Sequence, residues 1–216
     1  MNSVIQENFT ELHLKLGEMA KLVVTAIDQS VDALKDKDIE KAKQIRRKDK
    51  LINKIRWDIE ERCITLIATQ QPVASDLREV ISLLYIITEL ERIGDYAAGI
   101  AKITVLIGDE EHVKPLIDIP RMRDIAIDMI ENTMKAYITQ SEKSARMIHS
   151  QDDDIDALYK QVYRELISFM IEKPANITQC THLLWVAHNL ERMGDRVTNI
   201  CERIIYLSTG ERADDL

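Results

Sequence analysis

Two six-residue segments that differ at one position lie 100 residues apart in this chain of 216 residues. They read LERIGD at 90–95 and LERMGD at 190–195. In each copy a glutamate and an aspartate stand four residues apart on either side of a glycine. On a helix, side chains at this spacing project from one face with Cβ atoms about 5–6 Å apart. The chain is therefore expected to contain two copies of one helical unit, each with an acidic site.

The repeat extends over most of the chain. An offset of 103 residues aligns Met19 with Met122 and Ile52 with Ile155. The offset falls slightly after this point and reaches 100 at the two LER-x-GD segments, so only short deletions separate the copies. A period of about 100 residues indicates a duplicated domain and not a solenoid.

The composition favours long helices. Six glycines and four prolines are few turn-forming residues for this length, and 31% of the residues are charged. Apolar residues recur at steps of three and four, which predicts three amphipathic helices in each copy. The predicted helices span 4–34, 39–69 and 73–107 in the first copy and 122–137, 142–171 and 177–207 in the second. Asp38 and Ser141 occupy matching positions and are good N-caps for the second helix of each copy.

One glycine and two prolines within residues 108–120 mark a linker. We expect a first repeat at 1–107 and a second at 121–216. The predicted fold is all-α, with two tandem antiparallel three-helix bundles related by pseudo-twofold symmetry.

The charge balance argues against nucleic-acid binding. The chain has 29 basic and 37 acidic side chains, a net charge of −8, whereas a phosphate backbone requires clustered cations. The run KAKQIRRK at 41–48 is the exception. It is either a solvated helix face or a docking surface for an acidic partner.

Three cysteines, Cys63, Cys180 and Cys201, lack metal-type spacing and are expected to be buried free thiols. This usage favours a reducing, cytoplasmic compartment. The first residues show no secretory signal. No apolar run approaches the length of a membrane-spanning helix, so no membrane insertion is expected.

Carboxylates are the main candidates for chemistry. Glu91 and Asp95 recur as Glu191 and Asp195, and a second i,i+4 pair precedes each segment. If the second and third helices of each copy meet there, the oxygen-bearing side chains would form a site for a hard cation or a multinuclear metal centre. The additional predicted ligands are Asp49, Asn53, Asp152 and Asp156.

The second copy is richer in ligand types. His188 extends the stripe of Glu191 and Asp195, and Asn199 continues it, whereas Thr88 and Gly99 hold the matching positions in the first copy. A metal site should therefore be stronger in the second copy. The alternative is a set of exposed acids that form weak ion pairs with Arg92, Arg192 and nearby lysines. Likewise, the two motif glycines indicate either a tight helix crossing or room for an ion.

Catalytic motifs are missing from the sequence. It contains no glycine-rich phosphate loop, nucleophile elbow, CxxC or HExxH. His13, His112, His149 and His182 look isolated, and Trp57 and Trp185 are expected to pack in the core or at a helix interface. The chain is therefore predicted not to be an enzyme.

The tandem repeat, the two LER-[IM]-GD segments and the segment QQPVASDLR at 70–78 together resemble the PhoU family of phosphate-uptake regulators. The resemblance covers essentially the whole chain. It implies a cytoplasmic, often dimeric negative regulator of phosphate uptake and phosphate-starvation signalling. Its partners would be the ATPase subunit of the high-affinity phosphate ABC transporter and the phosphate sensor histidine kinase.

The resemblance also implies an iron or zinc cluster at the E-x-x-x-D helices. On this chain that maps to Glu91, Asp95, Glu191 and Asp195, with the second acidic pairs as further ligands. The second copy lacks the PVASDLR run and has KPANIT at 173–178. Two other functions stay open, a carboxylate-metal hydrolase and a metal-free structural helical dimer.

Overall fold

The computed structural model describes residues 3–210, and the outermost residues of both predicted repeats lie outside this range. Seven α-helices and one short 3-10 turn make up the described chain, which contains no strand. The helices are α1 (Ser3–Asp36), α2 (Ile39–Gln70), α3 (Ser75–Ile107), α4 (Asp118–Thr139), α5 (Glu142–Ser150), α6 (Asp152–Glu172) and α7 (Ile177–Thr209); the 3-10 turn η1 (Pro174–Asn176) precedes α7. The predicted all-α class is confirmed.

The predicted N-caps of the second helices are confirmed. The Asp38 carboxylate accepts a hydrogen bond of 2.9 Å from the backbone N–H of Lys41. The Ser141 hydroxyl accepts one of 3.3 Å from the N–H of Ser144. Each cap satisfies an N–H group that has no partner within the helix.

The two copies differ in their second helix. α2 is continuous, whereas the segment predicted as one helix at 142–171 is divided into α5 and α6 at Gln151. Three aspartates, Asp152, Asp153 and Asp154, form the first turn of α6. Carboxylates at a helix N-terminus are favoured by the helix dipole, and the first copy has only one acid in the matching segment 49–51.

The connection between the copies is shorter than predicted because α4 begins at Asp118. Pro120 lies in its first turn, where the missing N–H has no helical partner to lose. Gln179 of α7 holds the connection in place. Its side chain accepts a hydrogen bond of 2.6 Å from the N–H of Val113 and donates one of 2.9 Å to the carbonyl of Glu111.

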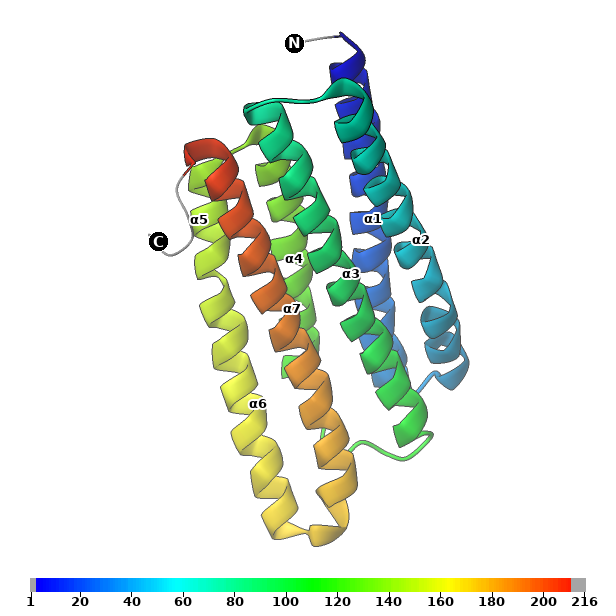
Figure 1. Cartoon of the computed structure of the whole chain (residues 1–216). Helices are drawn as coiled ribbons and strands as arrows, with labels where there is room; N and C mark the ends of the chain where they lie inside the picture. The colour runs from blue at the N-terminus through cyan, green and yellow to red at the C-terminus, as the bar shows by residue number, and fades with distance from the viewer. Residues whose placement is uncertain (1–2, 211–216) are drawn as a thin grey trace.

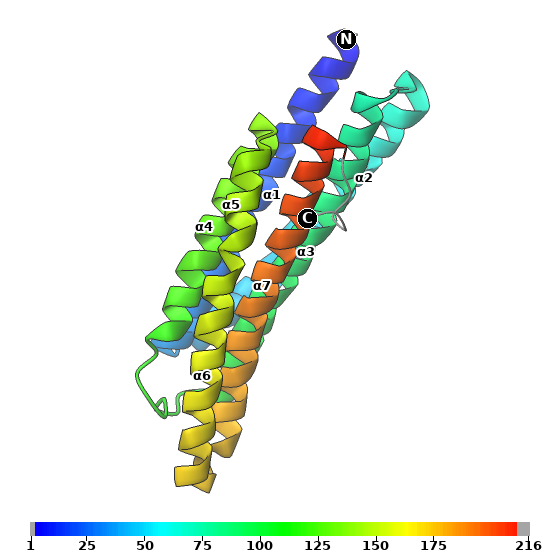
Figure 2. The ribbon, with the colours of Figure 1, turned by 90° about the vertical axis from the view of Figure 1, so that its left-hand side faces the viewer.

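The two bundles pack side by side (Figure 1). α2 packs against α1 and α3, while α5 and α6 pack against α7 in the second bundle. The bundles join through α3 against α7 and α1 against α4. The view turned by 90° shows one elongated molecule in which α3 and α7 run alongside each other (Figure 2). α3 and α7 are antiparallel, because Glu89 lies beside Asn199 and Gly99 beside Asn189.

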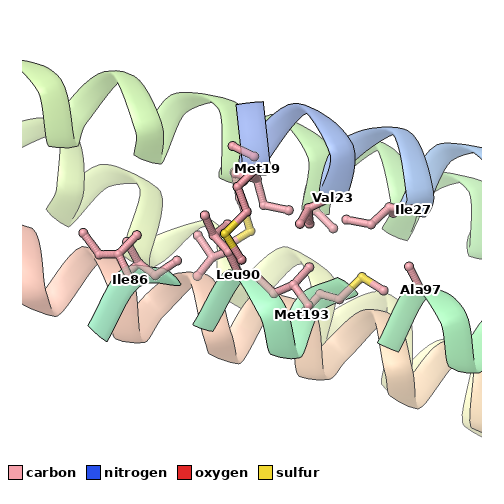
Figure 3. Close-up of a cluster of buried hydrophobic side chains, with 14 of the residues drawn as sticks. Met19, Val23, Ile27, Ile86, Leu90, Ala97 and Met193 are labelled. Atoms are coloured by element: carbon pink, nitrogen blue, oxygen red, sulfur yellow. The ribbon is translucent and has the colours of Figure 1, made fainter. Parts of the chain in front are cut away.

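The bundles share one hydrophobic core. Figure 3 shows Met19 and Val23 of α1, Leu90 and Ala97 of α3, and Met193 of α7 in one cluster. All five side chains are fully buried. The second half therefore contributes directly to the core of the first, and each LER-x-GD segment has its apolar residues at this junction.

The three cysteines are buried and unpaired, as predicted. The prediction for the tryptophans is wrong. Trp57 is 60% exposed and Trp185 is 56% exposed. Each ring rests on a polar neighbour: the Arg56 guanidinium lies 4.8 Å from the Trp57 ring centre, and the His188 ring lies 5.6 Å from that of Trp185. None of the helices in the described chain has the length and apolar character needed to cross a membrane.

Candidate functional site

The second half brings its predicted acidic residues together where α6 begins beside the middle of α7. Asp152 is the first residue of α6, and its carboxylate lies against Gly194. A Cβ atom at position 194 would overlap Asp152 Oδ1 and lie 3.2 Å from Ile155 Cδ1. The motif glycine thus allows α6 to approach α7 closely. The carboxylate of Asp152 occupies the space where a larger residue would have its Cβ atom.

Burial and neighbouring carboxylates act together on Asp152. Burial, together with the carboxylates of Asp195, Asp156 and Glu191, raises the pKa of Asp152 to about 6. Burial and the same aspartate neighbours also raise the pKa of Glu191. Carboxylates that raise one another's pKa in this way lie within electrostatic reach of each other.

Two oxygen atoms in this group have no hydrogen-bond partner although they are buried. They are Asp152 Oδ1 and Glu191 Oε2. The latter lies 3.3 Å from Nδ1 of His188 without forming a hydrogen bond. Buried polar atoms in proteins usually have a partner. Unpartnered carboxylate oxygens have the donor chemistry that a cation requires.

The remaining acids have protein partners. Asp195 accepts a hydrogen bond of 2.6 Å from Arg192, and Asp156 one of 3.2 Å from Lys160. These contacts offset part of the negative charge of the group.

The first half has the same arrangement with less negative charge. Burial, and to a lesser extent the carboxylate of Asp95, raises the pKa of both Asp49 and Glu91. Asn53 replaces one carboxylate and donates a hydrogen bond of 3.4 Å to Asp49. Arg92 lies 3.8 Å from both Glu91 and Asp95. The second half therefore has more carboxylates in its group, and a stronger metal site there stays a prediction.

Gly94 makes room for an apolar side chain. A Cβ atom there would lie 2.9 Å from Ile52 Cδ1 and 3.6 Å from Asp49 Oδ1. Both motif glycines therefore mark a close helix approach, and each has a carboxylate beside it, which lies closer at Gly194 than at Gly94.

Within residues 3–210, no three histidine, cysteine, aspartate or glutamate side chains converge to hold a metal ion. The predicted ligands are neighbours, and their carboxylates would have to rotate toward a common point to bind one. Metal binding by these residues stays a prediction.

Two polar residues near the second group were missed by the sequence reasoning. His149, expected to be isolated, lies 3.8 Å from Glu202 and lowers the pKa of Asp152. His149 lies three residues before Asp152, and Glu202 lies seven residues after Asp195. Because these are helical steps, periodicity could have identified both residues. The matching residues of the first copy are the cations Arg46 and Lys102.

Asn199 does not extend the metal stripe as expected. Its side-chain amide lies 3.5 Å from Glu89 of the first half, and Arg196 lies 3.4 Å from the same carboxylate. Glu89 is only 6% exposed. Asn199 therefore belongs to the contact between α3 and α7. This role cannot be predicted without knowing how the two copies pack.

The raised pKa of Asp152 predicts a pH dependence of stability. An acid with a higher pKa in the folded state favours folding when protonated, so the free energy of unfolding should fall as pH rises from about 4 to about 6. After allowance for screening by solvent, Asp152 should account for about 1 kcal/mol of this loss. Urea unfolding in metal-free buffer at about pH 4 and about pH 7.5 measures it.

Asp152→Asn removes the titrating group and should reduce the difference between the two pH values. It should also make the chain more stable than wild type at the higher pH. Asp153→Asn, at an exposed neighbour, is the matched control. Equal pH dependence in wild type and Asp152→Asn would show that neither burial nor the neighbouring carboxylates raise the pKa of Asp152 in the folded chain.

Comparison with known proteins identifies the family. Residues 16–104 and 119–204 each match the model of the PhoU domain. The chain belongs to the PhoU family. Each match covers one of the two halves and includes one LER-x-GD segment.

Relatives and solved structures of the PhoU family are similar over nearly the whole chain. A phosphate-specific transport system accessory protein PhoU homolog of Clostridium acetobutylicum is 37% identical over 98% of this chain and 97% of its own. One from Aquifex aeolicus is 39% identical over 90% of this chain and 88% of its own. The crystal structure of PhoU from Pseudomonas aeruginosa has a TM-score of 0.90 at 31% identity, covering 95% of this chain and 99% of that one.

Proposed function

We propose that this chain is an accessory protein of a phosphate-specific transport system and a negative regulator of phosphate uptake and phosphate-starvation signalling. The observation that carries the proposal is the similarity, over nearly full length, to relatives named as accessory proteins of such a system. The duplicated LER-x-GD segments at the junction of the two bundles support it further. In this role the chain acts in the cytoplasm as a non-enzymatic adaptor.

The proposed partners are the ATPase subunit of the phosphate ABC transporter and the phosphate sensor histidine kinase. A homodimer is proposed as the assembly state. The two bundles share one hydrophobic core, so a partner would meet them as a single body.

The second half is the proposed metal site. Asp152, Glu191 and Asp195 would provide carboxylate oxygens, with Asp156 and His188 at the rim. The unpartnered buried oxygens and the carboxylate held against Gly194 fit a cation. A bound iron or zinc ion would supply positive charge that offsets the repulsion around Asp152, and it would link α6 to α7. Asp49, Asn53, Glu91 and Asp95 would form a weaker site in the first half.

The hydrolase alternative requires a metal with an open position and a substrate pocket beside it. It predicts that the zinc- or iron-loaded chain hydrolyses chromogenic phosphate esters, and absence of turnover would exclude it. A metal-free structural dimer predicts that no metal is retained by purified protein.

The test of the adaptor role is direct binding to the transporter. Purified chain is titrated into the phosphate transporter in detergent, with a transporter that lacks its ATPase subunit as the control. We expect saturable binding that depends on the ATPase subunit. Equal binding to both preparations, or binding to neither, would contradict the proposed partner.

A further inference from the structure

A stripe of cations runs along the outer face of α2. Seven lysines and arginines occur between positions 41 and 54, against one acid, Asp49. With helical steps of about 100° per residue, five of them fall within a sector about 100° wide that points away from the buried face of α2. These five residues, together with Trp57 in the same sector, define the α2 stripe; the cations are Lys43, Arg46, Arg47, Lys50 and Lys54.

Most of the α2 stripe is unpaired. Lys43 forms an ion pair of 2.7 Å with Glu40. In residues 3–210, Arg46, Arg47, Lys50 and Lys54 form no ion pair with any acidic side chain, although the chain as a whole has an excess of acids. An accumulation of unpaired like charges on one helix face is unfavourable in the isolated molecule, which points to an external anionic surface.

The position of α2 leaves the stripe accessible. α2 packs only against α1 and α3 and forms one edge of the molecule, opposite the edge formed by α5 and α6 (Figure 1). The four unpaired cations are exposed, and Trp57 continues the stripe as an exposed ring with the Arg56 guanidinium above it.

The second half has no matching stripe. At the aligned positions, Arg46 and Arg47 become His149 and Ser150, and Lys50 becomes Asp153. Arg146, which matches Lys43, is paired with Glu142 at 2.8 Å. The cluster of unpaired cations is therefore found on α2 and is not repeated on the matching helices of the second half.

We propose that the α2 stripe docks the chain on an anionic lipid surface. Clusters of four to eight cations on an exposed helix face bind acidic headgroups, each cation adding about fivefold to the affinity. Tryptophan is favoured at the boundary between headgroups and acyl chains. A straight helix edge can contact a flat layer of headgroups along its length. The opposite edge, where Asp153 and Asp154 of α6 are exposed, would face away from the membrane. Docking would therefore fix the orientation of the molecule on the lipid surface.

The test uses the full chain and two kinds of vesicle, phosphatidylcholine alone and phosphatidylcholine mixed with phosphatidylglycerol. The variant Arg46→Gln/Arg47→Gln/Lys50→Gln/Lys54→Gln removes the unpaired cations. A matched control, Lys135→Gln/Lys143→Gln/Arg164→Gln/Lys173→Gln, removes four exposed cations from the second half and changes the net charge equally. Circular dichroism confirms that both variants keep their helicity.

We expect wild type and the matched control to bind only vesicles that contain phosphatidylglycerol, more weakly at high salt. The stripe variant should lose at least about 100-fold in affinity. In Trp185→Phe, which leaves Trp57 as the only tryptophan, the emission should shift to shorter wavelength on these vesicles.

Three outcomes would overturn the proposal. They are no binding of wild type to phosphatidylglycerol vesicles, equal binding by the stripe variant, or equal losses in the stripe variant and the matched control. Stripe-dependent binding to poly-glutamate without any binding to vesicles would overturn it in favour of an acidic protein surface.

Discussion

Gly194→Leu is expected to destabilise the chain by about 3 kcal/mol or more, one of the largest effects of any single substitution at the acidic group. A side chain at this position would enter the space held by Asp152 and contact Ile155, both in the first turns of α6. The neighbouring residues Leu190, Met193 and Val197 are fully buried, so α6 would have to move away from α7. Urea unfolding monitored by circular dichroism measures the change.

Gly194→Ala and Gly94→Ala form the matched pair. Each gains about 1 kcal/mol of helix propensity. At 94 the Cβ meets the end of the flexible Ile52 side chain at 2.9 Å, so the net change should be close to zero. At 194 the Cβ would overlap the carboxylate of Asp152, where α6 packs closely against α7. Gly194→Ala should therefore lower the free energy of unfolding. If Gly194→Leu is as stable as wild type, the first turn of α6 does not pack closely against the glycine.

The second large effect is on metal retention. Glu191→Gln with Asp195→Asn should lower the affinity for zinc by at least about 10-fold, because it neutralises two proposed carboxylate ligands, one of which carries the unpartnered Oε2. Isothermal titration with zinc, and anaerobically with ferrous iron, measures it. The paired variant Glu91→Gln with Asp95→Asn should change the affinity less, since Asn53 and Arg92 already reduce the negative charge there.

Helicity in metal-free buffer separates a binding site from a structural network. We expect both double variants to keep wild-type helicity, because these side chains lie on partly exposed faces. Equal loss of affinity in the two halves would contradict the asymmetry between the sites. A loss of folding without metal would instead make the acids part of the structural core.

The fold could be predicted from this sequence because its strongest signals are local or repeated. Helical periodicity, the caps Asp38 and Ser141, and the duplication give the three-helix unit, and the structure confirms it. The break at Gln151 was not predicted, because the apolar period continues across it. It results from three consecutive aspartates that are favoured at a helix N-terminus.

The acidic groups were predictable for the same reason. Spacing at i,i+4 predicts that Asp152 shares a helix face with Asp156 and that Glu191 shares one with Asp195. Whether the two pairs face each other depends on how α6 packs against α7, which spacing alone does not give. The roles of Glu89 and Asn199 were not predictable, since they depend on the antiparallel packing of α3 on α7. The exposure of Trp57 also escaped prediction, because hydrophobicity alone favours burial, whereas an adjacent arginine allows an aromatic ring to stay at the surface.

The most direct test of the regulatory role is expression of the phosphate-starvation response in phosphate-rich medium, with and without this chain. Alkaline phosphatase activity and transcript levels of the phosphate transporter are measured in the deletion strain and in the strain complemented with wild type. The proposed function predicts high expression in the deletion strain despite ample phosphate, and restored repression on complementation. Expression that stays low in the deletion strain, with no other PhoU-family gene in the genome, would contradict the assignment of this chain as a negative regulator.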